Sequence, residues 1–332
     1  MKTIETLITK KKIVKDKEDN KNIKINEIIK ENFKQDYRTL LSNILVNENS
    51  HNLKLLSAFD PKKDEEFEVE NNNTKLKIRT SDLLGEQTIT KFNDTQGKIW
   101  DFILTQCYIL VDSAEIKKVI INLAELCDFL GQTFQTQTVN NLKENLNLMS
   151  KVKLKYKYKG IDDAIGNLFL IDSITKKSEI IIVLGTWFDV ISQNKELQSY
   201  MLVNSKTYTN SKTNNGSDPH YIISRKIHEI YKNNFSKHKK IIEDKGQYEI
   251  SISSKTFIKS LCWSEISLKK DTKKFYNKLI EILKKIEKEQ KIYFDIIDCN
   301  IKGLNKYELF LRTKFIFYSD ILYKEYKEKG YN

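Results

Sequence analysis

Large apolar residues recur at steps of three and four along the middle of the chain and predict amphipathic helices there. Over 99–110 these residues fall on one helical face. The short β-branched run at 118–122 predicts a strand. A second helix is expected over 123–130 and should end at Gly131, because glycine readily adopts the left-handed conformation of a helix C-terminus. Thr138 is expected to cap a third helix. Its inward side chains would be Val139, Leu142, Leu146 and Met149.

After the third helix, lysine alternates strictly with apolar residues. Over 151–158 this alternation is typical of a strand that is buried on one face only. Helix, strand, helix, turn, helix and basic strand follow one another in the order of a winged helix-turn-helix. In a helix-turn-helix the second helix of the pair enters the DNA major groove. The basic strand would then form the wing, where the backbone phosphates pass.

A similar order of elements is expected again in the last third of the chain. Pro219 can begin a helix, because the first helical position needs no backbone N–H. The pattern then predicts a strand at 248–253, helices at 255–263 and 271–289, and a strand pair at 291–297 and 307–318. We therefore predict an α+β protein with two tandem winged-helix (helix-turn-helix) domains.

The remaining segments set the expected domain boundaries. The N-terminal region is rich in charge and predicts a flexible arm with accessory elements, among them a helix over 32–45 and a hairpin over 67–78. The segment between the two domains is rich in Asn, Ser, Thr and Lys, which is typical of a linker or mobile loop. The expected division is an arm at 1–90, a first domain at 91–203, a linker at 204–218 and a second domain at 219–332.

Charge and cysteine content narrow the class of protein. The formal net charge is +12, and residues 200–332 hold 27 Lys and Arg against 16 Asp and Glu. This one-sided surplus favours a polyanionic partner. The four cysteines lie far apart, mostly within apolar runs, so reduced thiols and a cytoplasmic location are expected. No apolar run approaches the roughly 18 residues that a membrane span needs, and the N-terminus lacks the pattern of a signal peptide.

The expected DNA contacts fall into three groups. The third helix would present amide and basic groups to base edges, since Asn and Gln can read adenine bidentately and Lys can bind guanine or phosphate. These base-reading candidates are Gln135, Gln137, Asn140, Asn141, Lys143 and Asn147. The wing would offer Lys153 and Lys155. Phosphate contacts in the second domain are expected from Arg225, Lys269, Lys270, Lys273, Lys274 and Lys278. The competing interpretation is that these abundant residues only solvate helix surfaces.

No catalytic pattern was found in the sequence. There is no G-x-x-x-x-G-K-[ST] loop for a nucleotide. The four histidines form no His-x-His pair of the kind found in metal-dependent nickases, and His220, His228 and Cys262 lack zinc-ligand spacing. Tyrosines such as Tyr108 and Tyr276 lie among apolar residues, which is typical of a core. We therefore expect a binding protein with no catalytic residues, no metal and no cofactor.

These patterns resemble those of plasmid replication initiators, the Rep proteins that bind iterons, over roughly residues 90–300. The matching passages are a helix ending in Ile109-Leu110, the helix Leu123–Gly131, Val139–Met149 running into a basic strand, and the helix Tyr221–Tyr231. The resemblance implies two winged-helix modules that bind repeated double-stranded DNA sites at an origin. It also implies recruitment of host replication proteins, and a homodimer that is less active than the monomer.

Two other functions stay open at this point. A transcription regulator or plasmid-partition protein would need the same DNA-reading surface. Direct repeats of about 20 base pairs beside the gene would favour an initiator, whereas a single palindrome would favour a repressor. A nuclease or strand transferase with an unrecognised site is the third possibility, and metal-dependent cleavage of supercoiled DNA would identify it.

Overall fold

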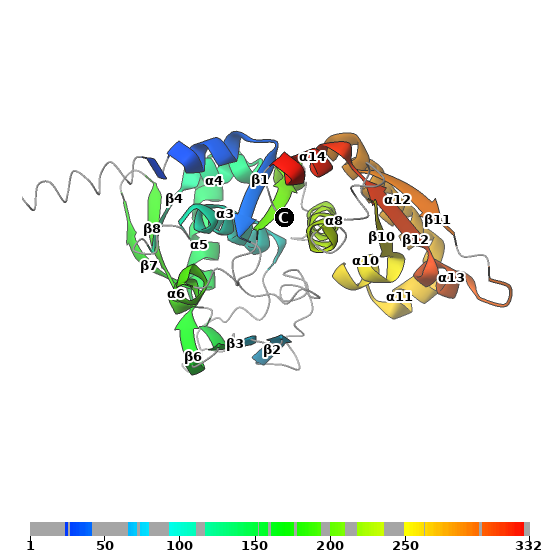
Figure 1. The fold of residues 1–332 in the computed structure, drawn as a ribbon, viewed down its shortest axis with the longest axis horizontal. Helices are drawn as coiled ribbons and strands as arrows, with labels where there is room; N and C mark the ends of the chain where they lie inside the picture. The colour runs from blue at the N-terminus through cyan, green and yellow to red at the C-terminus, as the bar shows by residue number, and fades with distance from the viewer. Residues whose placement is uncertain are drawn as a thin grey trace, which may run out of the picture.

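The computed structural model describes residues 24–25, 27–41, 66–71, 74–79, 93–110, 117–151, 153–158, 161–175, 178–193, 200–209, 218–235, 249–261, 263–298 and 301–328. Figure 1 shows two units, each with a helical part and a small sheet, joined by a central helix and a strand pair. Most of the predicted N-terminal arm, including 1–23, lies outside the described residues.

The first unit contains a three-stranded antiparallel sheet packed against helices. Its elements in chain order are α3 (Asp94–Leu110), β4 (Lys118–Asn122), α4 (Leu123–Leu130), α5 (Thr136–Ser150), β7 (Phe169–Ile174), β8 (Glu179–Leu184) and α6 (Thr186–Gln193). The sheet order is β4-β8-β7, so the last strand lies in the middle. As predicted, Gly131 ends α4 in the left-handed conformation, with φ of 64°. A Cβ at this position would lie 2.6 Å from the Thr209 carbonyl oxygen, which leaves no room for a side chain.

The second unit repeats this order of elements. Its elements are α8 (Pro219–Phe235), β10 (Glu249–Ser253), α10 (Ser254–Ser260), α11 (Glu265–Lys270), α12 (Thr272–Gln290), β11 (Tyr293–Ile297), α13 (Lys306–Arg312), β12 (Lys314–Tyr318) and α14 (Asp320–Glu328). The sheet order is β10-β12-β11, which again places the last strand in the middle. The α+β class is therefore confirmed and the element order repeats, but the strand predicted over 307–318 is wrong in its first half, which forms α13 before the shorter strand β12.

Two hydrophobic cores meet at one helix and one strand pair. The first turns of α8 supply Tyr221 and Ile222 to the first core, and the following residues, Ile223 and Ile227 among them, supply the second. The ribbon of β1 (Tyr37–Leu41) and β9 (Tyr200–Asn204) also contributes side chains to both cores. Burial of this apolar surface is the main force that holds the two units together.

The β1 strand corrects the predicted helix over 32–45. Helix occupies 27–34, and the chain then extends into β1, where all five residues are buried. A strand that is buried on both faces shows no alternation, so its apolar run can be mistaken for one face of a helix. Its antiparallel partner β9 lies far along the chain, and local pattern could not reveal that pairing.

Both ends of the predicted linker at 204–218 are packed into the junction between the two units. Residues 206–209 form the short helix α7 (Lys206–Thr209), in which Thr207 and Tyr208 are buried, and Asp218 is buried as well. The part between them, 210–217, lies outside the described residues. The polar composition of this segment therefore includes groups that pair inside the protein as well as groups that face water.

A second sheet combines two strands that precede α3 with two strands between α5 and β7, and it corrects the predicted wing. It is antiparallel and has the order β2-β3-β5-β6. Its strands are β2 (Glu66–Asn71), β3 (Thr74–Arg79), β5 (Lys153–Tyr158) and β6 (Ile161–Asn167). The β2–β3 pair confirms the predicted hairpin, and α6 packs against β5 and β6. The basic strand β5 thus joins this sheet, because β3 offers an edge with the same alternation, whereas β4 is paired with β8.

Candidate nucleic-acid interface

Helix α5 separates an apolar face from a polar face, on which the exposed Glu144 lies among the amides. Leu142, Leu146 and Met149 are fully buried, as their spacing predicts. Val139 is only half-buried. The helix begins at Thr136, two residues before the predicted cap, and its N-cap residue Gln135 makes no side-chain capping bond. The capping prediction was therefore wrong, although the phase of the helix was right.

Five of the six base-reading candidates are exposed on or beside the outer face of α5. They are Gln135, Gln137, Asn140, Asn141 and Asn147, whereas Lys143 is half-buried. The Asn145 amide donates to the Asn141 backbone oxygen at 2.8 Å, which involves only the backbone of Asn141. In the described part of the chain, the side-chain amides of Gln137 and Asn140 have no hydrogen-bond partner, so both remain available to an external one.

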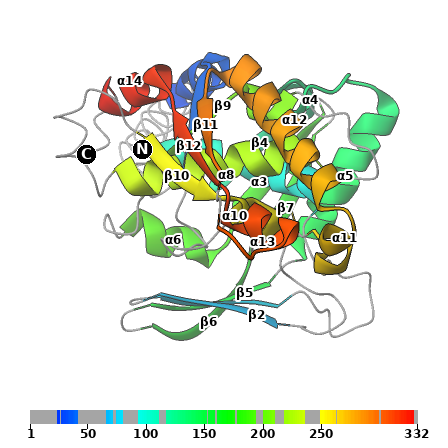
Figure 2. The ribbon, with the colours of Figure 1, turned by 90° about the vertical axis from the view of Figure 1, so that its right-hand side faces the viewer.

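Helices α11 and α12 present a basic counterpart in the second unit. The inward face of α12 includes Leu279, Leu283 and Ile286. All five lysine candidates of the second unit are exposed: Lys269, Lys270, Lys273, Lys274 and Lys278. The Asp271 carboxylate accepts the Lys274 backbone N–H and caps α12. Figure 2 shows α5, α11 and α12 toward the same side of the molecule, although they belong to different units.

Among these lysines, Lys269 forms both an ion pair and an aromatic contact within the protein. Its Nζ atom lies 2.8 Å from a Glu265 carboxylate oxygen and 5.4 Å from the centre of the Tyr307 ring. The hydrogen bond with Glu265 raises the pKa of Lys269 and lowers the pKa of Glu265. Both side chains are exposed, and such surface pairs are weak, so a phosphate could replace the carboxylate at little cost.

Lysines 273 and 274 provide a direct test of phosphate binding. Each phosphate contact adds about −0.9 to the slope of the logarithm of the binding constant against the logarithm of salt concentration. Changing Lys273 and Lys274 to Ala should weaken binding to all duplexes alike and flatten this slope by about 1–2 units. Titrations of a fluorescent duplex over a range of salt concentrations would measure it. Lys324→Ala, on α14, is the matched control, and an unchanged slope in the double variant would show that the two lysines only contact water.

Arg225 does not lie on this surface, and its predicted phosphate contact is corrected. Its side chain is 1% exposed and forms a two-point ion pair with Asp101 of α3. The Nε–Oδ2 distance is 2.9 Å and the Nη2–Oδ1 distance is 3.2 Å. The neighbouring Lys226 is also buried and pairs with Glu229 at 3.2 Å. Arg225 was interpreted as a surface group, but it neutralises an acidic group inside the protein.

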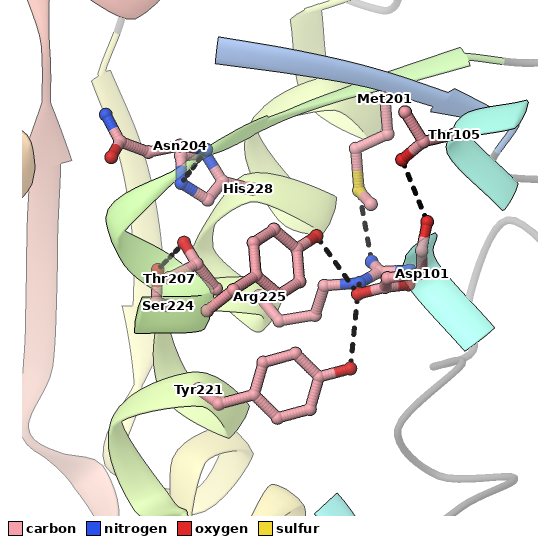
Figure 3. Close-up of polar contacts among 10 residues, drawn as sticks. Asp101, Thr105, Met201, Asn204, Thr207, Tyr221, Ser224, Arg225 and His228 are labelled. Carbon is pink, nitrogen blue, oxygen red and sulfur yellow. Dashed lines mark hydrogen bonds and ion pairs between the residues drawn. The ribbon is translucent and has the colours of Figure 1, made fainter. Parts of the chain in front are cut away.

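The ion pair is the centre of a polar cluster at the junction of the units (Figure 3). Tyr208 and Tyr221 each donate a hydroxyl hydrogen bond to Oδ2 of Asp101 at 3.1 Å. Burial alone would lower the pKa of Arg225, but the charge and hydrogen bond of Asp101 and the two tyrosines together raise it. Burial, and next the Asp101 charge, raise the pKa of both tyrosines. Arg225 is therefore a cation and both phenols are neutral donors.

A second set of buried hydrogen bonds extends this polar cluster to α12. Ser224 donates to Oε1 of Gln290 at 2.8 Å and lies 2.7 Å from the Thr207 hydroxyl. His228 Nε2 lies 3.2 Å from the same Gln290 oxygen. Burial lowers the pKa of His228 to about 3, so this imidazole is neutral at ordinary pH. Together the contacts link α3 and α7 to α8 and α12.

The sequence offered one signal for this cluster, which was overlooked. Asp101 stands inside an apolar run, between Ile99–Trp100 and Phe102–Leu104. A charged residue on the buried face of a helix needs a partner of opposite charge. Arg225 follows an equally apolar run at 221–223. Two single charges of opposite sign, each within an apolar helical segment, would therefore have predicted a buried ion pair.

The second sheet places the predicted wing lysines beside other basic residues. The register sets Lys153, Lys155 and Lys157 of β5 directly opposite Arg79, Lys77 and Lys75 of β3. On the other side of β3, the same three basic residues face Glu66, Glu68 and Glu70 of β2. On β6, Lys153 and Lys155 have Asn167 and Ile165 as their partners, and Asp162 and Asp163 lie near the other end of that strand. Lys153 and Lys155 thus remain candidate phosphate ligands, although not as part of a wing.

The described residues contain no group of three or more His, Cys, Asp or Glu side chains that could hold a metal ion. Among the helices in the part of the chain that the structure covers, none is both long and apolar enough to span a bilayer.

Comparison with known proteins gives similarity in structure only. No family model matches this chain, and no curated protein matches its sequence. A crystal structure of selenomethionine derivatives of domains 2 and 3 of RctB is similar with a TM-score of 0.44 and 8% identity, covering 79% of this chain and 94% of that chain. A second crystal structure of RctB domains 2–3 is similar with a TM-score of 0.41 and 7% identity, covering 77% and 92% of the two chains.

Proposed function

We propose that this chain is a sequence-specific double-stranded DNA-binding protein, made of two winged-helix domains, that acts as a replication initiator at repeated origin sites. The main support is the repeated element order, in which the longest helix between strand and hairpin exposes a polar face in each unit. These two helices lie toward the same side of the molecule (Figure 2), so one duplex could contact both. The proposal involves binding alone, with no catalytic residue or cofactor.

The two units would contribute different kinds of contact. The outer face of α5 carries amides, which hydrogen-bond to base edges and identify them. The outer face of α12 carries lysines, which attract phosphates of any sequence. We therefore assign sequence reading mainly to the first unit and general affinity mainly to the second. Host replication proteins and a second copy of the chain are the further partners in this proposal.

Asn140 and Asn141 test the sequence-reading role. An amide that binds adenine through two hydrogen bonds contributes about 1–3 kcal/mol of discrimination against other bases. Asn140→Ala and Asn141→Ala should each relax the preference at one base pair while leaving affinity for unrelated duplexes almost unchanged. Selection of preferred sites from a random duplex library, performed with wild type and each variant, would measure this.

Gln193→Ala, which removes an exposed amide from α6, is the matched control and should keep the wild-type site. If both Asn variants also keep it, α5 does not read sequence. The selected sites also separate the initiator from its nearest alternative. Direct repeats beside the gene support the initiator, whereas one palindrome supports a transcription regulator.

A further inference from the structure

Each unit exposes one large apolar side chain in the connection that leads to its long helix. Phe134 is 50% exposed in the segment between α4 and α5. Ile266 is 81% exposed on α11, the segment between α10 and α12. Among the exposed large hydrophobic residues in the described part of the chain, Ile266 has the highest exposed fraction. In both units this segment leads directly into the long helix that carries the polar face.

The segments that carry these two residues are anchored in the cores by apolar neighbours. Phe129 and Leu130, just before the turn of the first unit, are buried, and so is Leu268, two residues after Ile266. Single exposed apolar residues are common and need no explanation. Their occurrence in the corresponding connection of both units, Phe134 in the turn before α5 and Ile266 on α11, is the observation that needs one.

The polar, uncharged surroundings of Phe134 favour contact with a DNA base edge over contact with a phosphate. All seven residues of 131–137 are exposed, and none of them is charged. The glutamines in this segment can donate and accept hydrogen bonds, as base edges require. Ile266 lies by contrast close in sequence to Lys269, Lys270, Lys273 and Lys274, which would hold the phosphates on either side of a groove.

We infer that Phe134 and Ile266 pack against thymine methyl groups in the major groove of a double-stranded site. This inference rests on the proposed function. The first residues of the recognition helix meet base edges in a helix-turn-helix, and Phe134 lies just before these residues in the first unit, whereas Ile266 lies on the preceding helix α11 in the second. The only apolar group on those edges is the C5-methyl of thymine, and Phe is among the side chains that contact it. The target site is accordingly rich in A·T pairs at two separated positions, one for each unit.

Deoxyuridine provides a probe that differs from thymidine only in this methyl group. A duplex site obtained by selection with the full chain is prepared with each thymine replaced in turn by uracil. Loss of a buried methyl weakens binding about three- to fourfold. Wild type should show this loss at two sets of positions. Phe134→Ala should abolish the loss at one set, and Ile266→Ala should abolish it at the other.

Two control variants separate this effect from others. Ile321 is 45% exposed on α14, and Ile321→Ala should keep the complete wild-type pattern. Lys274→Ala should weaken binding to thymine and uracil duplexes by the same factor. Circular dichroism of each variant checks folding, which is expected to be unchanged because all the replaced side chains are exposed.

Each result decides between the two proposals. If the wild-type chain binds no duplex, the proposed function fails and this inference fails with it. If it binds a selected site but the two apolar variants keep the wild-type ratio of thymine to uracil affinity at every position, only this inference is overturned. The same conclusion follows if the variants change the sedimentation of the chain without changing that ratio, because the side chains would then contact protein.

Discussion

Replacing Arg225 with methionine is expected to lower the free energy of unfolding by about 3–5 kcal/mol. The guanidinium and the Asp101 carboxylate are both almost fully buried, at 1% and 2% exposure. Removing one partner of such a pair leaves the other charge in a poorly solvating environment, and that desolvation is the main cost. Urea unfolding of the full chain, followed by circular dichroism, would measure the change.

Two comparisons make this prediction specific to the buried pair. Lys118→Met breaks the exposed pair with Asp172 on the first sheet, where the two atoms are 3.1 Å apart, and should cost under about 1 kcal/mol. A double variant, Asp101→Leu with Arg225→Met, should recover part of the lost stability because no unpaired charge remains, while the Tyr208 and Tyr221 hydroxyls lose their acceptor. Wild-type stability in Arg225→Met would show that the ion pair does not exist in solution.

Leu142→Ala is expected to destabilise the first unit by about 2–5 kcal/mol. Leu142 is 1% exposed and packs in the first core, where a shorter side chain would leave a cavity. Trp100 and Trp187 lie in this core, with ring centres 5.7 Å apart, so tryptophan fluorescence during urea unfolding reports on it. DNA binding should disappear in this variant together with folding.

Leu170→Ala, at a leucine that is 52% exposed on β7, is the matched control and should change stability by well under 1 kcal/mol, as is usual at the surface. If Leu142→Ala unfolds like wild type, the orientation of α5 is wrong. The outward positions assigned to Asn140 and Asn141 would then be wrong as well.

The helices and their inward faces could be predicted from sequence because each is amphipathic and local. Leu142, Leu146 and Met149 recur at the helical period, and Gly131 has the φ angle that its position after α4 requires. What stays a prediction is the role of the exposed amides and lysines, since exposure alone does not identify a ligand.

The features that sequence reasoning missed depend on contacts between distant segments. The β1 residues Tyr37–Leu41 have a strand partner that lies beyond the whole first unit. The basic strand β5 pairs with β3, which precedes the first unit in the chain. Arg225 pairs with Asp101 of another helix, and that pairing decides between a surface cation and a buried one. A pattern of apolar residues reports the burial of one face, but it does not report which segment covers it.

Helix α8 packs in both cores, and this limits the spacing between two DNA half-sites that one chain could bind. Its first turn packs in the first core, its later residues pack in the second, and Arg225 between them is held by Asp101. Neither unit can rotate about this helix without disrupting its own core. On B-form DNA, a shift of about 5 base pairs turns a groove to the opposite side of the duplex, and about 10 base pairs bring it back. A chain joined in this way would therefore recognise the helical phase between two half-sites as well as their sequences.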